Sequence, residues 1–246
     1  MTVPAVQAER ARAIMIELFP QGFEEVDRTD GVELAAYTDP AGEERLWAAF
    51  GGARSDEVDE GWEDRWRAFH KPVRIGPLWV GPPWEDPDAG AIAVVIDPGR
   101  AFGTGSHATT RLCLELMLDL QAGSVLDVGC GSGVLAIAAA KLDFEPVYAV
   151  DLDPQAIEAT NRNAEANGVR VDARVGDALT DDLPTADAAV VNVALEPDRP
   201  IAERLDCTRL ITSGYLAAET PDFAGFRRET RREAEGWAAD LHIRTK

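Results

Sequence analysis

A glycine-rich turn between an apolar strand and an apolar helix constrains this chain more than any other feature. Residues 125–128 lead into three glycines at alternate positions, Gly129, Gly131 and Gly133, and residues 133–141 continue as an apolar helix. Glycine reaches the backbone conformations that such a turn requires, and a turn without side chains lets a ligand approach the backbone at the start of the helix. The pattern predicts a strand, a tight turn and a helix. A tight turn without a ligand is the alternative explanation.

The chain from residue 108 onward alternates strand-like and helical stretches. This alternation predicts an α/β domain with a mostly parallel sheet that helices cover on both faces. The expected strands are 125–128, 147–150, 170–175, 188–193 and 209–212, and the expected helices are 111–120, 133–141, 154–167 and 197–205. Two alternating runs around Glu235-Gly236 predict an antiparallel pair that closes a seven-stranded sheet.

The first part of the chain predicts a small α+β domain. Residues 5–19 place apolar side chains at helical spacing. The pair Asp30-Gly31 lies between two strand-like runs, and such a pair supplies the positive φ of a tight hairpin turn. A unit of about 60 residues is marginal by itself, so we expect it to depend on the larger domain.

Residues 71–90 form a compositional boundary, because they hold five of the fifteen prolines and three glycines. The runs Val-Arg-Ile and Leu-Trp-Val on either side of Gly76-Pro77 predict two short strands, which would make this segment a structured strap. We therefore expect a small α+β domain at residues 1–58, a helix and connector at 59–90 and the α/β domain at 91–246.

The charge of the chain disfavours nucleic acid as a direct partner. The chain carries 24 basic and 44 acidic residues, which gives a formal net charge of −20, and such a surface repels phosphates. Six of the ten residues at 55–64 are acidic. The acidic excess either maintains solubility or attracts a basic partner, and both explanations stay open at this stage.

No pattern in the sequence predicts a metal site, a disulfide framework or a membrane span. The three cysteines, Cys113, Cys130 and Cys207, are widely separated. The longest apolar runs, 91–96 and 134–140, are much shorter than the roughly 20 residues that a spanning helix needs. Charged residues near the start of the sequence oppose a signal peptide. We expect a cytoplasmic protein, and we expect it to be a monomer.

Carboxylates at the expected strand ends predict an adenosine-containing ligand. Asp151 follows the second strand, 22 residues after Gly129, and a carboxylate in that place accepts hydrogen bonds from ribose hydroxyls in nucleotide-binding sheets. Asp153 lies closer to the helix cap before Pro154, which leaves Asp151 for the ligand. Asp177 follows the third strand and suits an exocyclic amine, and a solvated loop aspartate is the other interpretation.

The acidic residue before the glycine turn helps to distinguish a dinucleotide from other adenosine-containing ligands. A dinucleotide fingerprint requires a small residue where Val134 stands. A carboxylate at Asp127 suits a cationic ligand with an ammonium and a sulfonium better than it suits a pyrophosphate. The pattern Asp-x-Gly-x-Gly-x-Gly is similar to motif I of class I S-adenosylmethionine-dependent methyltransferases. We therefore expect S-adenosyl-L-methionine as the cofactor, with Asp127, Gly129, Gly131, Asp151 and Asp177 among the residues that bind it.

Residues 98–110, Pro-Gly-Arg-Ala-Phe-Gly-Thr-Gly-Ser-His-Ala-Thr-Thr, make the resemblance more specific. Together with residues 129–139, residues 151–154, Asn192 and Ser213-Gly214, they resemble the PrmA family, the methyltransferases of large-subunit ribosomal protein eleven. The resemblance implies a Rossmann-like class I methyltransferase domain preceded by a small α+β ferredoxin-like domain. It also implies cofactor contacts from Phe102, Thr110, Gly129, Asp151 and Asn192.

The resemblance implies the transfer of methyl groups to amines of a basic ribosomal protein, on lysine side chains or the N-terminal amine. Asn192 would be the catalytic residue that orients the incoming amine, and the small domain would recognise the substrate. Three alternatives stay open. They are a small-molecule methyltransferase that uses the same cofactor site, a nicotinamide-dependent oxidoreductase and a non-catalytic scaffold.

Two residue types near residue 108 allow more than one role. His107 either acts as a base or packs beside the glycine-rich segment. Ser106, Thr109 or Thr110 is a candidate N-cap for the helix at 111–120, because short hydroxyl side chains cap helices well.

Overall fold

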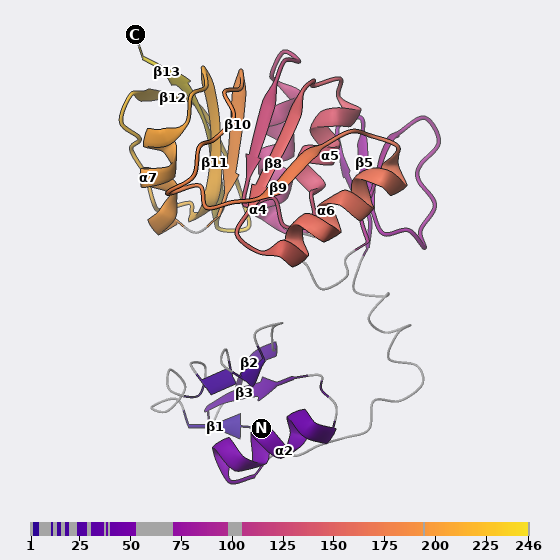
Figure 1. The fold of residues 1–246 in the computed structure, drawn as a ribbon, viewed down its shortest axis with the longest axis vertical. Helices are drawn as coiled ribbons and strands as arrows, with labels where there is room; N and C mark the ends of the chain where they lie inside the picture. The colour runs from indigo at the N-terminus through magenta and orange to yellow at the C-terminus, as the bar shows by residue number, and fades with distance from the viewer. Residues whose placement is uncertain are drawn as a thin grey trace. The chain divides into compact units, whose positions relative to one another are not determined.

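The computed structural model describes residues 2–4, 11, 14–15, 18–19, 24–28, 31–36, 38, 40–52, 71–97, 105–193 and 195–245. The predicted acidic segment at 55–64 and the predicted cofactor residue Phe102 lie outside these residues. The chain divides into two compact units, Met1–Glu63 and Asp64–Lys246 (Figure 1), and this division falls inside the expected connector at 59–90.

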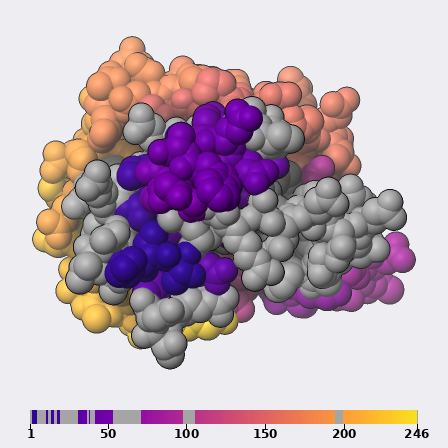
Figure 2. Space-filling model, turned by 90° about the horizontal axis from the view of Figure 1, so that it is seen from below, coloured from indigo at the N-terminus to yellow at the C-terminus, as the bar shows by residue number. Residues whose placement is uncertain are grey.

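The first unit contains a three-stranded antiparallel sheet and a helix. The strands β1 (Thr2–Val3), β2 (Glu24–Arg28) and β3 (Gly31–Ala35) lie in the order β1-β3-β2. The pairing of β2 with β3 confirms the predicted hairpin. Helix α2 (Pro40–Phe50) has an exposed tryptophan, Trp47. Figure 2 shows the described atoms of the first unit in indigo and violet. The ferredoxin-like class of this unit stays a prediction.

Residues 11, 14, 15 and 18 of the first unit are helical, in agreement with the predicted helix at 5–19. Ala11, Met15 and Phe19 follow one another at four-residue spacing, and all three are buried. This spacing places them on one face of a helix. They form a small core with Val32 and Leu34 of β3.

The strap predicted around Gly76-Pro77 is confirmed. Strands β4 (Val73–Ile75) and β5 (Leu78–Gly81) pair antiparallel, and β5 pairs in parallel with β6 (Ile92–Val95). The side chains of Leu78 and Val80 are buried in the main core of the second unit. The strap is therefore part of the second unit's packing and is not a loose tether.

The second unit is built on a seven-stranded sheet with the strand order β12-β13-β11-β10-β7-β8-β9 (Figure 1). The strands β11, β10, β7, β8 and β9 are parallel, β13 pairs antiparallel with β11, and β12 pairs antiparallel with β13. This arrangement confirms the α/β class and the antiparallel closing pair. The strands are β7 (Val125–Val128), β8 (Val147–Asp151), β9 (Asp172–Val175), β10 (Ala188–Asn192), β11 (Arg209–Leu216), β12 (Phe226–Ala234) and β13 (Trp237–Arg244).

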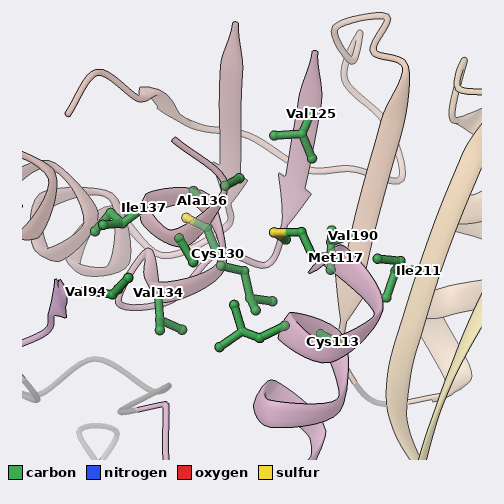
Figure 3. Packing of buried hydrophobic residues seen from close by; sticks show 14 of the residues in the cluster. Val94, Cys113, Met117, Val125, Cys130, Val134, Ala136, Ile137, Val190 and Ile211 are labelled. Atoms are coloured by element: carbon green, nitrogen blue, oxygen red, sulfur yellow. The ribbon is translucent and has the colours of Figure 1, made fainter. Parts of the chain in front are cut away.

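Helices cover both faces of this sheet because successive strand side chains point to opposite sides. Val125 lies in a core that includes α4 (Ala108–Leu118), α5 (Val134–Lys141) and part of α6 (Pro154–Asn167). Its neighbour Leu126 lies in a second core with Ile201 of α7 (Leu195–Arg204). Figure 3 shows residues of the first core. Among the described residues, no helix is long and apolar enough to cross a membrane.

Candidate functional site

The strand order places the candidate site at the carboxyl ends of β7 and β10. The chain proceeds from β7 to β8 and β9 on one side, and then returns to place β10 and β11 on the other side. At such a reversal the loops that follow the two adjacent strands, here β7 and β10, run in opposite directions and leave a crevice. Ligands of open α/β sheets bind in this crevice, outside the carboxyl ends of the strands. Gly129 follows β7 and Asn192 ends β10 at this edge.

The glycine turn (residues 129–133) needs glycine for two measurable reasons. Gly129, Gly131 and Gly133 have φ values of 73°, 55° and 82°, which side chains rarely adopt. A Cβ at Gly129 would lie 2.4 Å from Cγ1 of Val193, and a Cβ at Gly133 would lie 2.8 Å from the side chain of Thr160. The turn is therefore packed against Val193 and against Thr160 of α6.

Asp151 is bound to the glycine turn. Its Oδ2 accepts a hydrogen bond from the backbone N–H of Gly131 at 2.9 Å, and its Oδ1 accepts one from the N–H of Asp153 at 3.0 Å. Asp153 caps α6 through a 2.8 Å bond from the N–H of Gln155, as predicted. Each carboxylate oxygen of Asp151 has a second lone pair, so the half-buried side chain retains acceptor capacity for a ligand hydroxyl.

Asp127 is a buried acid with one unpaired oxygen. The side chain is 2% exposed, and its Oδ2 accepts a hydrogen bond from the N–H of Ala136 at 3.1 Å. Its Oδ1 has no hydrogen-bond partner within the described part of the chain. Burial raises the pKa of Asp127 to about 7, and the nearby charge of Asp151 adds to this rise while the Ala136 bond opposes it. A cation at this position would favour the ionised form.

The structure brings Thr110 and Asn192 together. Nδ2 of Asn192 donates to Oγ1 of Thr110 at 3.5 Å; Thr110 is buried and Asn192 is half-buried. The N-cap of α4 is His107, whose side chain accepts from the N–H of Thr109 at 3.3 Å. The three hydroxyl residues proposed for this cap are not the N-cap, which leaves Thr110 to face Asn192.

Helix α4 is also attached to the closing hairpin. The ring of His107 meets the ring of Trp237 edge-on at 5.1 Å, and Arg111 pairs with Glu235 at 2.6 Å. These contacts make His107 a helix cap that packs on the closing hairpin, a role that neither of the two sequence-based alternatives named, and a role as a base stays a prediction.

Asp177 lies after β9, next to the end of β8, since the N–H of Gly176 donates to the carbonyl of Asp151 at 2.9 Å. Its Oδ1 accepts from the N–H of Leu179 at 2.8 Å, which closes a local turn. Its place at the strand edge agrees with the predicted position, and its contacts are those of a loop aspartate. A role in ligand binding stays a prediction.

The sequence analysis missed a polar face on α6 that holds the glycine turn. Oγ1 of Thr160 donates to the carbonyl of Gly131 at 3.1 Å, and Nδ2 of Asn163 donates to the carbonyl of Ser132 at 2.9 Å. The thiol of Cys130 lies 3.3 Å from Oγ1 of Thr160. Burial, followed by the charge of Asp127, raises the pKa of Cys130 to about 12, so this thiol stays protonated.

The same face of α6 holds the last residue of β6 and residue 97. Asn167 accepts from the N–H of Val95 at 2.9 Å and donates to its carbonyl at 2.6 Å, as a neighbouring strand would. Oδ1 of Asn163 accepts from the N–H of Asp97 at 3.1 Å. Polar residues at 160, 163 and 167 share one helical face with buried alanines, and this spacing is the signal that could have identified them.

The strand reversal, the glycine turn and the acid after the second strand define a Rossmann-like α/β domain of the class I methyltransferase type. The chain belongs to the family described as "Ribosomal protein L11 methyltransferase (PrmA)", whose profile matches residues 23–239. This match confirms the family predicted from residues 98–110 and 129–139.

Relatives with that name cover much of the chain. The protein from Vibrio vulnificus (strain YJ016) is 42% identical over 183 residues, which are 70% of this chain and 61% of that protein. The protein from Citrobacter koseri is 45% identical over 186 residues, which are 71% of this chain and 63% of that protein. The chain therefore spans less than two thirds of the length of these curated relatives.

A solved structure supports the same fold. The crystal structure of ribosomal protein L11 methylase from Lactobacillus delbrueckii subsp. bulgaricus is 28% identical, with a TM-score of 0.63. The match covers 71% of this chain and 99% of that chain.

We predict that Gly133→Ala lowers the free energy of unfolding more than Gly168→Ala. Both glycines have positive φ, 82° and 65°, but only the Cβ at Gly133 meets another side chain, whereas nothing lies within 4 Å of the Cβ at Gly168. The left-handed backbone costs about 1 kcal/mol in each variant, and the clash with Thr160 adds about 1–3 kcal/mol at Gly133. Urea denaturation measures both losses, and equal losses would show that the turn is not tightly packed against α6.

Proposed function

We propose that this chain transfers methyl groups from S-adenosyl-L-methionine to amines of a basic ribosomal protein, on lysine side chains or the N-terminal amine. We also propose that the protein is cytoplasmic and acts as a monomer. Family membership supports the reaction class. The single observation that carries the assignment to this site is the pairing of Asn192 with Thr110 at the strand edge that also holds the glycine turn and Asp151.

The residues of the site fit S-adenosyl-L-methionine. Oδ1 of Asp127 is buried and lacks a partner among the described residues, which suits a ligand ammonium. Asp151 retains acceptor capacity for ribose hydroxyls, and Gly129 and Gly131 leave the backbone open toward the ligand. Phe102, Thr110, Asp177 and Asn192 complete the proposed set. When bound, the cofactor would supply a methyl group attached to a sulfonium, and the sulfur would leave as a neutral thioether.

Asn192 orients the acceptor amine in this proposal. Its Nδ2 is directed to Oγ1 of Thr110, so its carbonyl oxygen is left to accept from an amine N–H. Lysine and N-terminal amines have ordinary pKa values of about 10.4 and 8, so an acceptor amine must lose a proton before it attacks. The amide of Asn192 does not titrate, and its role is therefore alignment of the nitrogen and not removal of the proton.

Labelled-methyl transfer tests the proposed reaction. The purified chain, incubated with methyl-labelled S-adenosyl-L-methionine and a ribosomal protein extract, is expected to label amines of one ribosomal protein, which mass spectrometry identifies. Asn192→Ala should lower kcat about 100-fold because the amine loses its alignment. Asn161→Ala, an exposed asparagine on α6, is the matched control and should keep wild-type kcat. Label in a small molecule without ribosomal protein would favour the alternative methyltransferase.

Binding of S-adenosylhomocysteine tests the role of Asp151. Asp151→Ala should weaken binding at least about 100-fold, because the variant loses a charged acceptor for the ribose and also releases the N–H of Gly131. Asp153→Ala, two residues on, removes the cap of α6 and should cost about 1 kcal/mol of stability while it keeps the affinity. Isothermal titration calorimetry measures both, and full affinity of Asp151→Ala would remove this residue from the site.

The pKa of Asp127 predicts a pH-dependent affinity. With a pKa of about 7, raised by burial, Asp127 is mostly neutral at pH 5.5 and about half ionised at pH 7. A cationic ligand binds the ionised form, so the affinity for S-adenosyl-L-methionine should rise roughly tenfold over this range, and binding at pH 6 should release protons.

Two controls isolate Asp127 as the cause. Asp127→Asn should show a flat affinity between pH 5.5 and pH 7, and so should adenosine, which carries no ammonium, on the wild-type protein. Calorimetry in two buffers of different ionisation enthalpy measures the proton release. An equal rise for adenosine, or for the Asn variant, would contradict the assignment.

A further inference from the structure

Four polar side chains form a buried hydrogen-bond chain on the side of the sheet that α7 covers. Nε2 of His242 lies 3.1 Å from Oγ1 of Thr212, which lies 2.8 Å from the hydroxyl of Tyr215. That hydroxyl lies 3.0 Å from Oδ2 of Asp240. None of the four side chains is more than 2% exposed. The chain of contacts joins β13 to β11, the strand that pairs with β10.

The direction of these hydrogen bonds follows from their ends. The hydroxyl of Tyr215 donates to Oδ2 of Asp240, so it accepts from Thr212, which in turn accepts from the Nε2–H of His242. Burial raises the pKa of Asp240, and the bond from Tyr215 and the nearby arginines oppose this rise. Burial lowers the pKa of His242 to about 4, so this ring is neutral at ordinary pH. Two guanidinium groups face Asp240, Arg231 at 3.6 Å and Arg228 at 3.8 Å from Oδ2.

Tyr215 is connected to Asn192 through two backbone contacts. Gly214, which precedes Tyr215, has a φ of 106°, and a Cβ on it would lie 1.7 Å from the carbonyl oxygen of Val193. The regular pairing of β11 with β13 is interrupted between Ser213 and Tyr215. The backbone of Gly214 therefore lies against Val193, the residue that follows Asn192.

Val193 also touches the glycine turn. Its Cγ1 lies 2.4 Å from where a Cβ of Gly129 would be, so no side chain separates the two residues. Asn192 is paired in the sheet with Ser213, one residue before Gly214. A shift at the end of β11 therefore moves Val193, and with it the backbone that carries Asn192.

We propose that Tyr215 is a positioning residue for Asn192, and that the buried hydrogen-bond chain fixes the end of β11 so that Gly214 holds Val193 in place. This inference rests on the proposed function, in which Asn192 orients the acceptor amine. A phenylalanine would fill the same volume without a bond to Asp240 or Thr212. Satisfied buried networks select one arrangement of the elements that they join, and a displacement of about 1 Å is enough to impair catalysis.

Tyr215→Phe tests this proposal because it removes the hydroxyl and keeps the ring. We expect kcat for methyl transfer to fall at least tenfold, with the dissociation constant for S-adenosylhomocysteine within threefold of wild type. Thr212→Val should lower kcat in the same direction, and Thr212→Ser, which keeps a hydroxyl, should restore it. Ile201→Val, which shortens a buried side chain in the core under α7, is the stability control and should lower Tm without changing kcat.

A double-mutant cycle separates positioning from general loss of stability. In an Asn192→Ala background, Tyr215→Phe should have no further effect on kcat, because its effect passes through Asn192. An equal fall in both backgrounds, or wild-type kcat in Tyr215→Phe, would overturn the proposal.

A measurement that does not depend on methyl transfer tests the positioning role of Tyr215 separately from the proposed function. In nuclear magnetic resonance spectra, Tyr215→Phe should shift or broaden the side-chain amide signals of Asn192, whereas Ile201→Val should leave them in place. If the wild-type chain transfers no methyl groups, the proposed function fails, and these signals still decide the positioning role. Unchanged Asn192 signals in Tyr215→Phe would overturn it.

Discussion

The contact of Val193 with two glycines holds the candidate site together. Its side chain lies against Gly129 and its backbone against Gly214, at distances that leave no room for a Cβ on either glycine. The loop after β7, the loop after β10 and the end of β11 are therefore packed as one layer. Since Asn192 immediately precedes Val193, the residue proposed to face the acceptor and the turn proposed to face the cofactor are placed by the same contact.

Polar side chains of helix α6 also fix the position of the glycine turn. Thr160 and Asn163 bind carbonyls of the glycine turn. Asn163 and Asn167 also bind the backbone at Asp97 and at Val95, the last residue of β6. Buried amides are costly unless they are paired, and these are paired on both sides. The helix thus holds two segments that are about 35 residues apart in the sequence at a fixed spacing, which strand pairing alone would not do.

The sequence predicted the elements that depend on local pattern and missed those that depend on tertiary contacts. The sheet, its closing hairpin and the strap follow from alternation and turn residues, and they were found. Asp153 as a cap was found because capping is local. The cap by His107 was missed because histidine is not a favoured cap and acts here while its ring packs on Trp237. The roles of Val193 and Tyr215 depend on strands far apart in sequence, so no local pattern reveals them.

Asp127 links the stability of the fold to the chemistry of the site. A buried carboxylate with one unpaired oxygen costs free energy, and burial shifts its pKa to about 7 to limit that cost. An apolar residue of similar size would remove the cost, and so would a bound cation. Asp240 also has one unpaired oxygen among the described residues, and burial raises its pKa as well, but two arginines and the hydroxyl of Tyr215 contact its other oxygen, Oδ2, and oppose that rise. No cation pairs with Asp127 among the described residues, and this difference from Asp240 supports the proposal that Asp127 binds a cationic ligand.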